Sequence, residues 1–280
     1  MINRKMIGRV LGMLLFIELG MFLLCAGVSA GYGESDYKYF LYTCIINAVV
    51  GGLLLLYGRG AENKMSRRDG YCVVTLSWVF FTFFGMLPFY FSGSIDTITN
   101  AFFETMSGFT TTGATILDDI ESLSHGMLFW RSLTQWIGGL GIVFFTIAIL
   151  PIFTTGGVQL FSAESTGVTH DRTHPKINVM AKWLWTIYLV LTVSETVLLM
   201  FGGMSLFDAI CQSFATTATG GYSTKQNSIS YWNSPYIEYV VAIFMIVSSI
   251  NFSLFLMCLK GKVGRLFKDE ELHWFLASVG

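Results

Sequence analysis

The sequence has 280 residues, of which 53% are hydrophobic, 16% aromatic and only 12% charged. This composition excludes an ordinary soluble domain and is typical of an integral membrane protein. The net charge of −1 leaves no basic face or arm that would bind nucleic acid. The five cysteines lie in or beside apolar runs without metal-binding spacing, so we expect reduced packing residues and no structural disulfide.

Six apolar stretches are long enough to cross a bilayer, which takes roughly 20 residues of helix. They cover residues 7–30, 39–57, 71–91, 127–153, 179–201 and 236–259. The first stretch is too long, and too closely followed by the second, to be a cleaved signal peptide. We therefore expect an all-α protein with several membrane spans.

The basic residues indicate how these spans are oriented. If the N-terminus is cytoplasmic, all but three of the 17 lysines and arginines fall in inner segments, the exceptions being Lys38, Arg131 and Lys225. Lysine and arginine accumulate on the cytoplasmic side of membrane proteins. The predicted topology therefore has the N-terminus inside and the connections after the third and fifth spans outside.

Two shorter apolar stretches, at 100–109 and 208–217, lead into segments rich in threonine and glycine. At 1.5 Å per residue each stretch predicts a helix of about 15 Å, roughly half of the bilayer core. The segments read SGFTTTGATIL at 107–117 and ATTATGGYST at 215–224. We expect both to enter the membrane from the outer face and return to it.

The two segments align at an offset of 108 residues, which places Gly113 on Gly221 and Thr111 on Thr219. Each copy then consists of a span, a half-length helix, a Thr/Gly turn and a second span, which indicates an internal repeat. The predicted segments are a two-helix N-terminal part at 1–66, a first unit at 67–155, a cytoplasmic linker with the second unit at 156–268, and the start of a third unit at 269–280.

Irregular backbone at membrane depth persists only where it is buried in protein or lines a water-filled path. Glycine allows positive φ there, and backbone carbonyls can replace the hydration shell of a monovalent cation. A single Thr/Gly run is more often a loop or a packing face, but two copies behind half-length helices favour a cation selectivity filter. The predicted ion ligands are the carbonyls of Thr110, Thr111, Thr112, Gly113, Ala218, Thr219, Gly220 and Gly221.

Together with WRSLTQWIGGLGIVFFTIAILP at 130–151 and KWLWTIYLVLT at 182–192, these segments resemble the TrkH-type subunits of the Trk/Ktr/HKT potassium-transport superfamily. The resemblance extends over essentially the whole chain. It implies four span–pore-helix–span units around one central pore, preceded by two helices, in a bacterial inner membrane. It also implies K⁺ as the transported ion without any cofactor, and Gly113, where some members carry serine, implies a preference for potassium over sodium.

The resemblance further implies a homodimer regulated by a cytoplasmic, nucleotide-binding ring of the TrkA type, which would meet the basic loops at 59–69 and 260–268. Because the family needs four units and this chain holds two, we expect the N-terminal part of a longer protein or a truncated product. Two functions stay open: a potassium-conducting pore subunit, or a non-conducting scaffold or assembly partner. An enzyme is not expected, since the sequence shows neither H-E-x-x-H nor a paired nucleophile and base.

Several polar residues within the predicted spans allow two interpretations. Glu18 and Glu195 either pair with neighbouring helices or take part in transport, because charge at membrane depth is costly. Asn251 is expected to bond between helices. Arg131, near the outer end of the fourth span, is expected to extend its side chain to the membrane interface, with an electrostatic role at the outer mouth as the alternative.

The remaining motifs are weaker. Gly138, Gly139 and Gly141 predict close helix packing in the fourth span, with a hinge as the alternative. His170 and His174 are four residues apart, as metal ligands can be, but in a loop before proline this spacing seldom marks a metal site. That loop is instead a candidate surface for a cytoplasmic partner.

Overall fold

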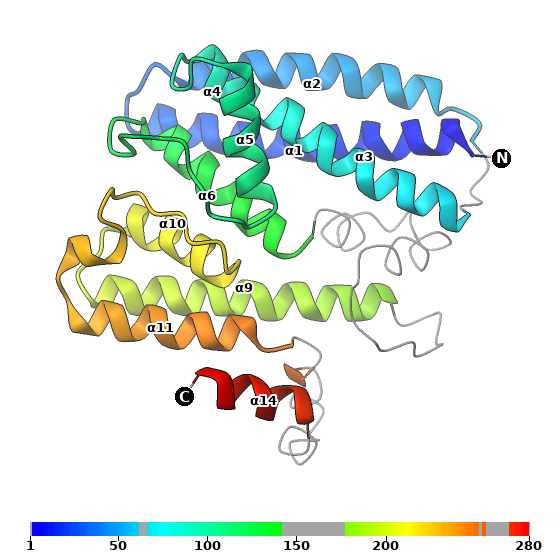
Figure 1. Ribbon diagram of the computed structural model, residues 1–280. Coiled ribbons are helices and arrows are strands. Elements are labelled where there is room, and N and C mark those ends of the chain that lie inside the picture. The colour runs from blue at the N-terminus through cyan, green and yellow to red at the C-terminus, as the bar shows by residue number, and fades with distance from the viewer. Residues whose placement is uncertain (1, 62–65, 142–176, 252–253, 256–268, 280) are drawn as a thin grey trace.

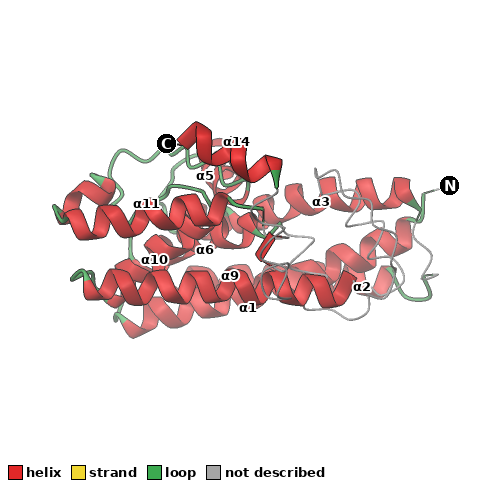
Figure 2. Ribbon diagram, turned by 90° about the horizontal axis from the view of Figure 1, so that it is seen from below, coloured by secondary structure: helices red, strands yellow, loops and turns green. Residues whose placement is uncertain are grey.

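The computed structural model describes residues 2–61, 66–141, 177–251, 254–255 and 269–279. Within these residues all regular structure is helical (Figures 1 and 2). The helices are α1 (Arg4–Gly31), α2 (Tyr37–Tyr57), α3 (Arg67–Gly85), α4 (Leu87–Phe91), α5 (Ile98–Phe109), α6 (His125–Gly139), α9 (Ile177–Phe201), α10 (Leu206–Thr217), the short 3₁₀ helix η3 (Ser228–Trp232), α11 (Pro235–Ser249) and α14 (Glu270–Val279).

The long helices lie side by side, and α6 is the element that joins their two groups. α1 packs against α2, α3 and α6, while α10 packs against α9, α6 and α11. In Figure 1 the connections from α1 to α2 and from α9 to α10 lie at the left end of the molecule, and the connection from α10 to α11 runs from the middle of the molecule back to that end. Because α6 contacts α5 as well as α10, it lies between the two short helices that precede the Thr/Gly segments.

Four of the six predicted spans are confirmed as helices that are long and apolar enough to cross a membrane. They cover Arg4–Gly31, Tyr37–Tyr57, Arg68–Phe91 and Lys182–Phe201. Large apolar side chains on their outer surfaces, such as Leu24 and Leu53, are more than half exposed, as expected of residues that face lipid.

The fourth and sixth predicted spans do not continue as single helices. α6 ends at Gly139, and Gly141 has a φ of 73°, which is outside the right-handed helical region. α11 ends at Ser249, and Ile250 is extended, with a ψ of 140°. Glycines in the first case, and serine and β-branched residues in the second, are poor helix formers. The prediction of one continuous helix for each of these spans is therefore wrong, because the helices break near Gly141 and at Ile250. Residues 142–153, 252–253 and 256–259 of the two predicted spans lie outside the described chain.

A cluster at one end of the bundle ties the α1–α2 connection to the start of α6. The carboxylate of Glu34 accepts hydrogen bonds from the backbone N–H groups of His125 and Gly126, at 3.0 and 3.4 Å, and lies 2.7 Å from the His125 ring nitrogen. Tyr32 stacks on the His125 ring at 3.8 Å. Burial alone would raise the pKa of Glu34, but these hydrogen bonds outweigh it and hold the pKa below its ordinary value of 4.5.

We expect Glu34→Gln to lower the stability of the folded protein by about 1 kcal/mol at neutral pH, because it weakens charge-assisted hydrogen bonds in a partly exposed place. A carboxylate with a depressed folded-state pKa stabilises the fold above its unfolded pKa and loses this effect as pH falls through the folded pKa. The difference between the two proteins should therefore vanish in acid. Thermal unfolding of both proteins at neutral pH and at a pH below 4.5 measures this difference in stability.

Asp36→Asn is the matched control, since Asp36 lies in the same connection but its side chain makes no capping hydrogen bond to α2. An equal loss of stability in both variants would contradict a specific role of Glu34.

Candidate functional site

Two twelve-residue helices, α5 and α10, end where the predicted filter residues begin. Their first turns are capped alike: Thr97 Oγ1 accepts from the N–H of Asn100 at 3.2 Å, and Ser205 Oγ accepts from the N–H of Asp208 at 3.1 Å. Each helix is about 18 Å long at the standard rise. The prediction of two half-length helices is thus confirmed.

The turn after each helix repeats the same backbone conformation. Thr111 and Thr219, the second residues of the two turns, have φ values of 53° and 55°. The fourth residues, Gly113 and Gly221, have φ values of 74° and 92°. Equivalent hydrogen bonds return to the helices, from Thr112 N–H to Ser107 C=O at 3.0 Å and from Gly220 N–H to Ala215 C=O at 2.8 Å. Since all these pairs are 108 residues apart, the predicted repeat is confirmed in the backbone.

Alternation of φ decides which way the backbone groups of each turn face. The first residues of the two turns, Thr110 and Ala218, have φ values of −81° and −79°, so a residue with negative φ is followed by one with positive φ in each turn. Such alternation gathers successive N–H groups on one side of the chain and the C=O groups on the other. Within the described chain, none of the eight carbonyl oxygens at 110–113 and 218–221 accepts a hydrogen bond. Thr110, Thr112, Thr219 and Gly221 are exposed, so the turns are open to an ion or to water.

The two turns lie against each other. A side-chain carbon on Gly113 would overlap the carbonyl oxygen of Gly220, and one on Gly220 would overlap the amide of Gln135. A side-chain carbon on Gly221, in contrast, would have no other atom within 4 Å. Glycine at 113 is therefore required both by its positive φ and by the neighbouring turn, whereas at 221 only the φ requires it.

Threonine side chains stiffen the first turn. Thr110 Oγ1 donates to the carbonyl of Met106 at 2.7 Å and lies 2.8 Å from Thr112 Oγ1. These local bonds hold the turn at the end of α5.

Arg131 corrects one sequence-based expectation. Its side chain does not extend to the membrane interface but is 2% exposed, with Nε 2.7 Å from Oε1 of Glu104, which is fully buried. A guanidinium in a low-dielectric interior needs a carboxylate partner, and α5 supplies one. Glu104 was missed in the sequence, although a glutamate within a ten-residue apolar stretch was a signal that could have found it.

Glu18 and Glu195 both pair with neighbouring helices, which is one of the two predicted interpretations. Asn47 of α2 donates to Glu18 of α1 at 3.0 Å, and the Thr217 hydroxyl of α10 donates to Glu195 of α9 at 3.3 Å. Thr217 directly precedes the second turn, so the hydrogen bond to Glu195 holds the end of α10 against α9.

Gly138 and Gly139 are packing residues, as predicted. A side-chain carbon at 138 would overlap the backbone of Phe109, and one at 139 would lie 2.8 Å from the Cα of Ala218. α6 therefore approaches the first turn and the second turn at adjacent positions. His170 and His174 lie outside the described residues.

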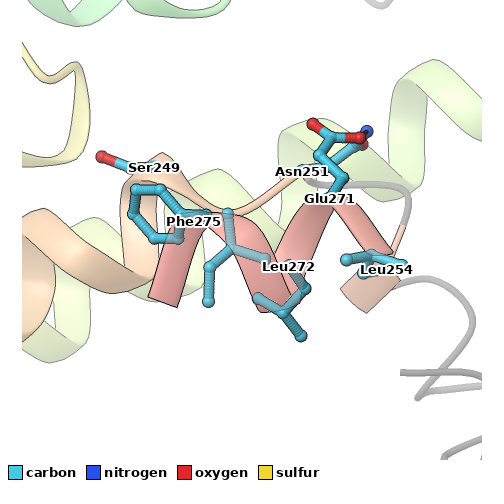
Figure 3. A pocket seen from close by; sticks show the side chains of 7 residues that line it. Ser249, Asn251, Leu254, Glu271, Leu272 and Phe275 are labelled. Atoms are coloured by element: carbon cyan, nitrogen blue, oxygen red, sulfur yellow. Dashed lines mark hydrogen bonds between the residues drawn. The ribbon is translucent and has the colours of Figure 1, made fainter. Parts of the chain in front are cut away.

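A pocket of about 190 Å³ lies elsewhere, between the end of α11 and α14. Figure 3 shows side chains that line it, from Ser249, Asn251 and Leu254 and from Glu271, Leu272 and Phe275 of α14. The Asn251 amide is 3.5 Å from Glu271, so the interhelical bond expected of Asn251 is present but long. This pocket includes none of the turn residues and adds no chemistry to the site.

Long apolar helices, two half-length helices and a repeated turn define an all-helical, multi-pass membrane protein built from repeated units. The family model described as TrkH, cation transport protein, matches residues 37–276. The chain belongs to this family.

Individual relatives agree with this assignment. The chain is 40% identical to the Trk system potassium uptake protein TrkH of Escherichia coli K12, over 97% of this chain and 57% of that protein. It is 36% identical to the protein of the same name from Halomonas elongata, over 98% of this chain and 58% of that protein.

Among solved structures, the crystal structure of the potassium transporter TrkH from Vibrio parahaemolyticus matches with a TM-score of 0.83 and 33% identity, over 97% of this chain and 56% of that one. The chain thus spans a little more than half the length of these relatives.

Proposed function

We propose that the chain supplies two of the filter segments of a potassium-conducting membrane pore. In this proposal the carbonyl oxygens of residues 110–113 and 218–221 replace the water around a dehydrated K⁺ ion. The observation that carries it is the pair of turns with alternating φ, whose eight carbonyls accept no hydrogen bond within the described chain. Carbonyl rings of this kind are the ligands that K⁺ filters use.

The electrostatics of the half-length helices support the same role. α5 and α10 both end at the turns. The C-terminal end of a helix carries a partial negative charge, which attracts a cation. The proposed chemistry is therefore passive coordination, and the family assignment agrees with a transporter that is not an enzyme.

The distribution of basic residues and the names of the relatives support a proposal for membrane location, topology and assembly. We propose a bacterial inner-membrane location with a cytoplasmic N-terminus, and the segment boundaries 1–66, 67–155, 156–268 and 269–280. The names of the relatives, which are Trk system potassium uptake proteins, support assembly in a Trk system. A homodimer above a TrkA-type nucleotide-binding ring is the assembly we propose.

Potassium or rubidium uptake in a transport-deficient bacterial strain tests this function. If two copies of the 280-residue chain bring their four filter segments together, they are expected to give uptake that prefers potassium over sodium. The double variant Gly113→Ser, Gly221→Ser should lose the uptake or the preference, because it adds side-chain atoms where the turns need glycine. Membrane fractions probed for the chain ensure that both proteins are inserted equally.

The alternative is a non-conducting scaffold or assembly partner. Uptake by the chain would exclude this alternative. No uptake from a chain that reaches the membrane would contradict a pore built from two copies, but it is expected both of a scaffold and of two filter segments that need further units.

A further inference from the structure

We propose that a buried polar seam positions the second filter turn against the first and thereby sets ion selectivity. The seam consists of Glu104 on α5, Arg131 and Gln135 on α6, and Tyr222 directly after the second turn. This inference rests on the proposed function and names the residues that fix the geometry of its site.

The centre of the seam is the ion pair of Arg131 and Glu104, whose side chains are 2% and 0% exposed. Glu104 uses both carboxylate oxygens, because Oε1 also accepts from the Thr115 hydroxyl and Oε2 accepts from the N–H of Ile116, each at 3.0 Å. Glu104 therefore fixes the chain that leaves the first turn. A buried pair adds little net stability over apolar packing, but breaking it leaves a costly lone charge, so its geometry is strongly enforced.

The seam then crosses from the first unit to the second. Arg131 Nη1 donates to the carbonyl of Ser223 at 2.9 Å, and its guanidinium lies 3.6 Å from the centre of the Tyr222 ring. The Tyr222 hydroxyl lies 2.8 Å from the carbonyl of Glu104 and 3.3 Å from that of Ala114. The residues that follow the two turns are thus bonded to the same group of side chains.

Gln135 of α6 contacts the second turn directly. Its Oε1 accepts from the N–H of Tyr222 at 3.1 Å, and its amide fills the space beside Gly220. The Nε2 group of Gln135 is buried and has no hydrogen-bond partner within the described chain. Since Gln135 is one helical turn from Arg131, a single face of α6 holds the ion pair and the contact to the second turn.

The seam is formed at the junction of the two units and is not a packing device that each unit repeats. Gln212 of α10 is equivalent to Glu104 at the offset of 108, and Nε2 of Gln212 bonds to Thr216 in its own helix. Counted from the start of its helix, Arg131 corresponds to Val241 of α11. Neither residue could form an ion pair, so the positional role is specific to this junction.

Three variants test the seam in the 280-residue chain. Tyr222→Phe removes one hydroxyl and keeps the ring. Arg131→Lys keeps the positive charge but loses the planar guanidinium, and Arg131→Gln removes the charge. The measurement is the ratio of potassium to sodium uptake, divided by the amount of protein in the membrane. We expect Tyr222→Phe to lower the ratio about fivefold, as the loss of a hydrogen bond to a neutral carbonyl would. Arg131→Lys should lower it about tenfold, because its hydrogen bond to the Glu104 carboxylate is weakened, and Arg131→Gln should lower it further.

A matched control pair is available at the surface of the same junction. Lys225 and Glu121 also join the two units, with Nζ 3.6 Å from Oε2 and side chains 23% and 42% exposed. Lys225→Gln should leave the uptake ratio unchanged, because exposed ion pairs contribute little. A selectivity that falls equally in Lys225→Gln and Tyr222→Phe, or in neither, would overturn the inference.

A second measurement separates the seam from the proposed function. In lipid nanodiscs, a double-mutant cycle of Glu104→Gln and Arg131→Gln on the midpoint of thermal unfolding should show that the two changes together cost less than the sum of both. This coupling does not depend on transport. Should the unchanged chain transport nothing, the proposed function fails while the cycle still decides whether the seam is coupled, and additive losses in the cycle would refute the seam.

Discussion

Gly113→Ala is expected to abolish potassium-selective uptake, whereas Gly221→Ala should preserve a measurable part of it. Both glycines have positive φ, with values of 74° and 92°, so each alanine imposes backbone strain of about 1–2 kcal/mol. Only at 113 does the added carbon also overlap the carbonyl oxygen of Gly220. That oxygen is one of the eight proposed ligands, and moving it removes part of the ion site.

The comparison is informative because the two substitutions are chemically identical and occupy equivalent positions in the repeat. Rubidium uptake at several external concentrations, with the membrane content of each variant determined in parallel, gives the ratio of the two effects. Equal losses in both variants would show that positive φ alone governs the turns. A more severe loss from Gly221→Ala would contradict the packing of the turns described above.

The repeat itself could be predicted from the sequence because its evidence is local. The half-length helices and the alignment of Gly113 with Gly221 follow from apolar lengths and from residue types that allow unusual backbone conformations. The structure places Thr111 and Thr219 in the same left-handed conformation, as an offset of 108 residues requires. Periodicity and turn chemistry thus predicted most of the fold and the backbone of the candidate site.

The seam could not be predicted in the same way, because it depends on contacts between distant parts of the chain. The position of Arg131 near the outer end of the predicted span is compatible with a side chain at the membrane interface, and only packing reveals its pairing with Glu104. Tyr222 lies 118 residues from Glu104 in the sequence. A signal was present, since Arg131 and Gln135 lie four residues apart on one face of an apolar helix, where polar residues usually have partners.

Helix ends were the other point at which local reasoning failed. Apolar composition favours a span through 236–259, but it does not reveal that the backbone at Ile250 is extended. At the end of α6 three glycines have two roles, since Gly138 and Gly139 pack closely, whereas Gly141, at positive φ, follows the end of the helix. Close packing and a hinge were predicted as alternatives, yet the structure shows close packing and a helix end at adjacent residues.

The second prediction with a large effect concerns this close packing. Gly138→Ala is expected to destabilise the folded protein by about 3 kcal/mol or more, because the added carbon would overlap backbone atoms of Phe109, which cannot rotate away. Alanine is a better helix former than glycine, but that gain is only about 1 kcal/mol. Overlap with the backbone therefore outweighs helix propensity at this position.

Gly52→Ala in α2 isolates the propensity effect, since nothing lies within 4 Å of a side-chain carbon at that position. We expect Gly52→Ala to leave the thermal unfolding midpoint unchanged or slightly raised, and Gly138→Ala to lower it markedly, with tryptophan fluorescence in nanodiscs as the measurement. Phe109 is the last residue of α5, so the same overlap should displace the first turn and reduce uptake. A Gly138→Ala protein as stable and active as Gly52→Ala would mean that α6 does not hold the turn in place.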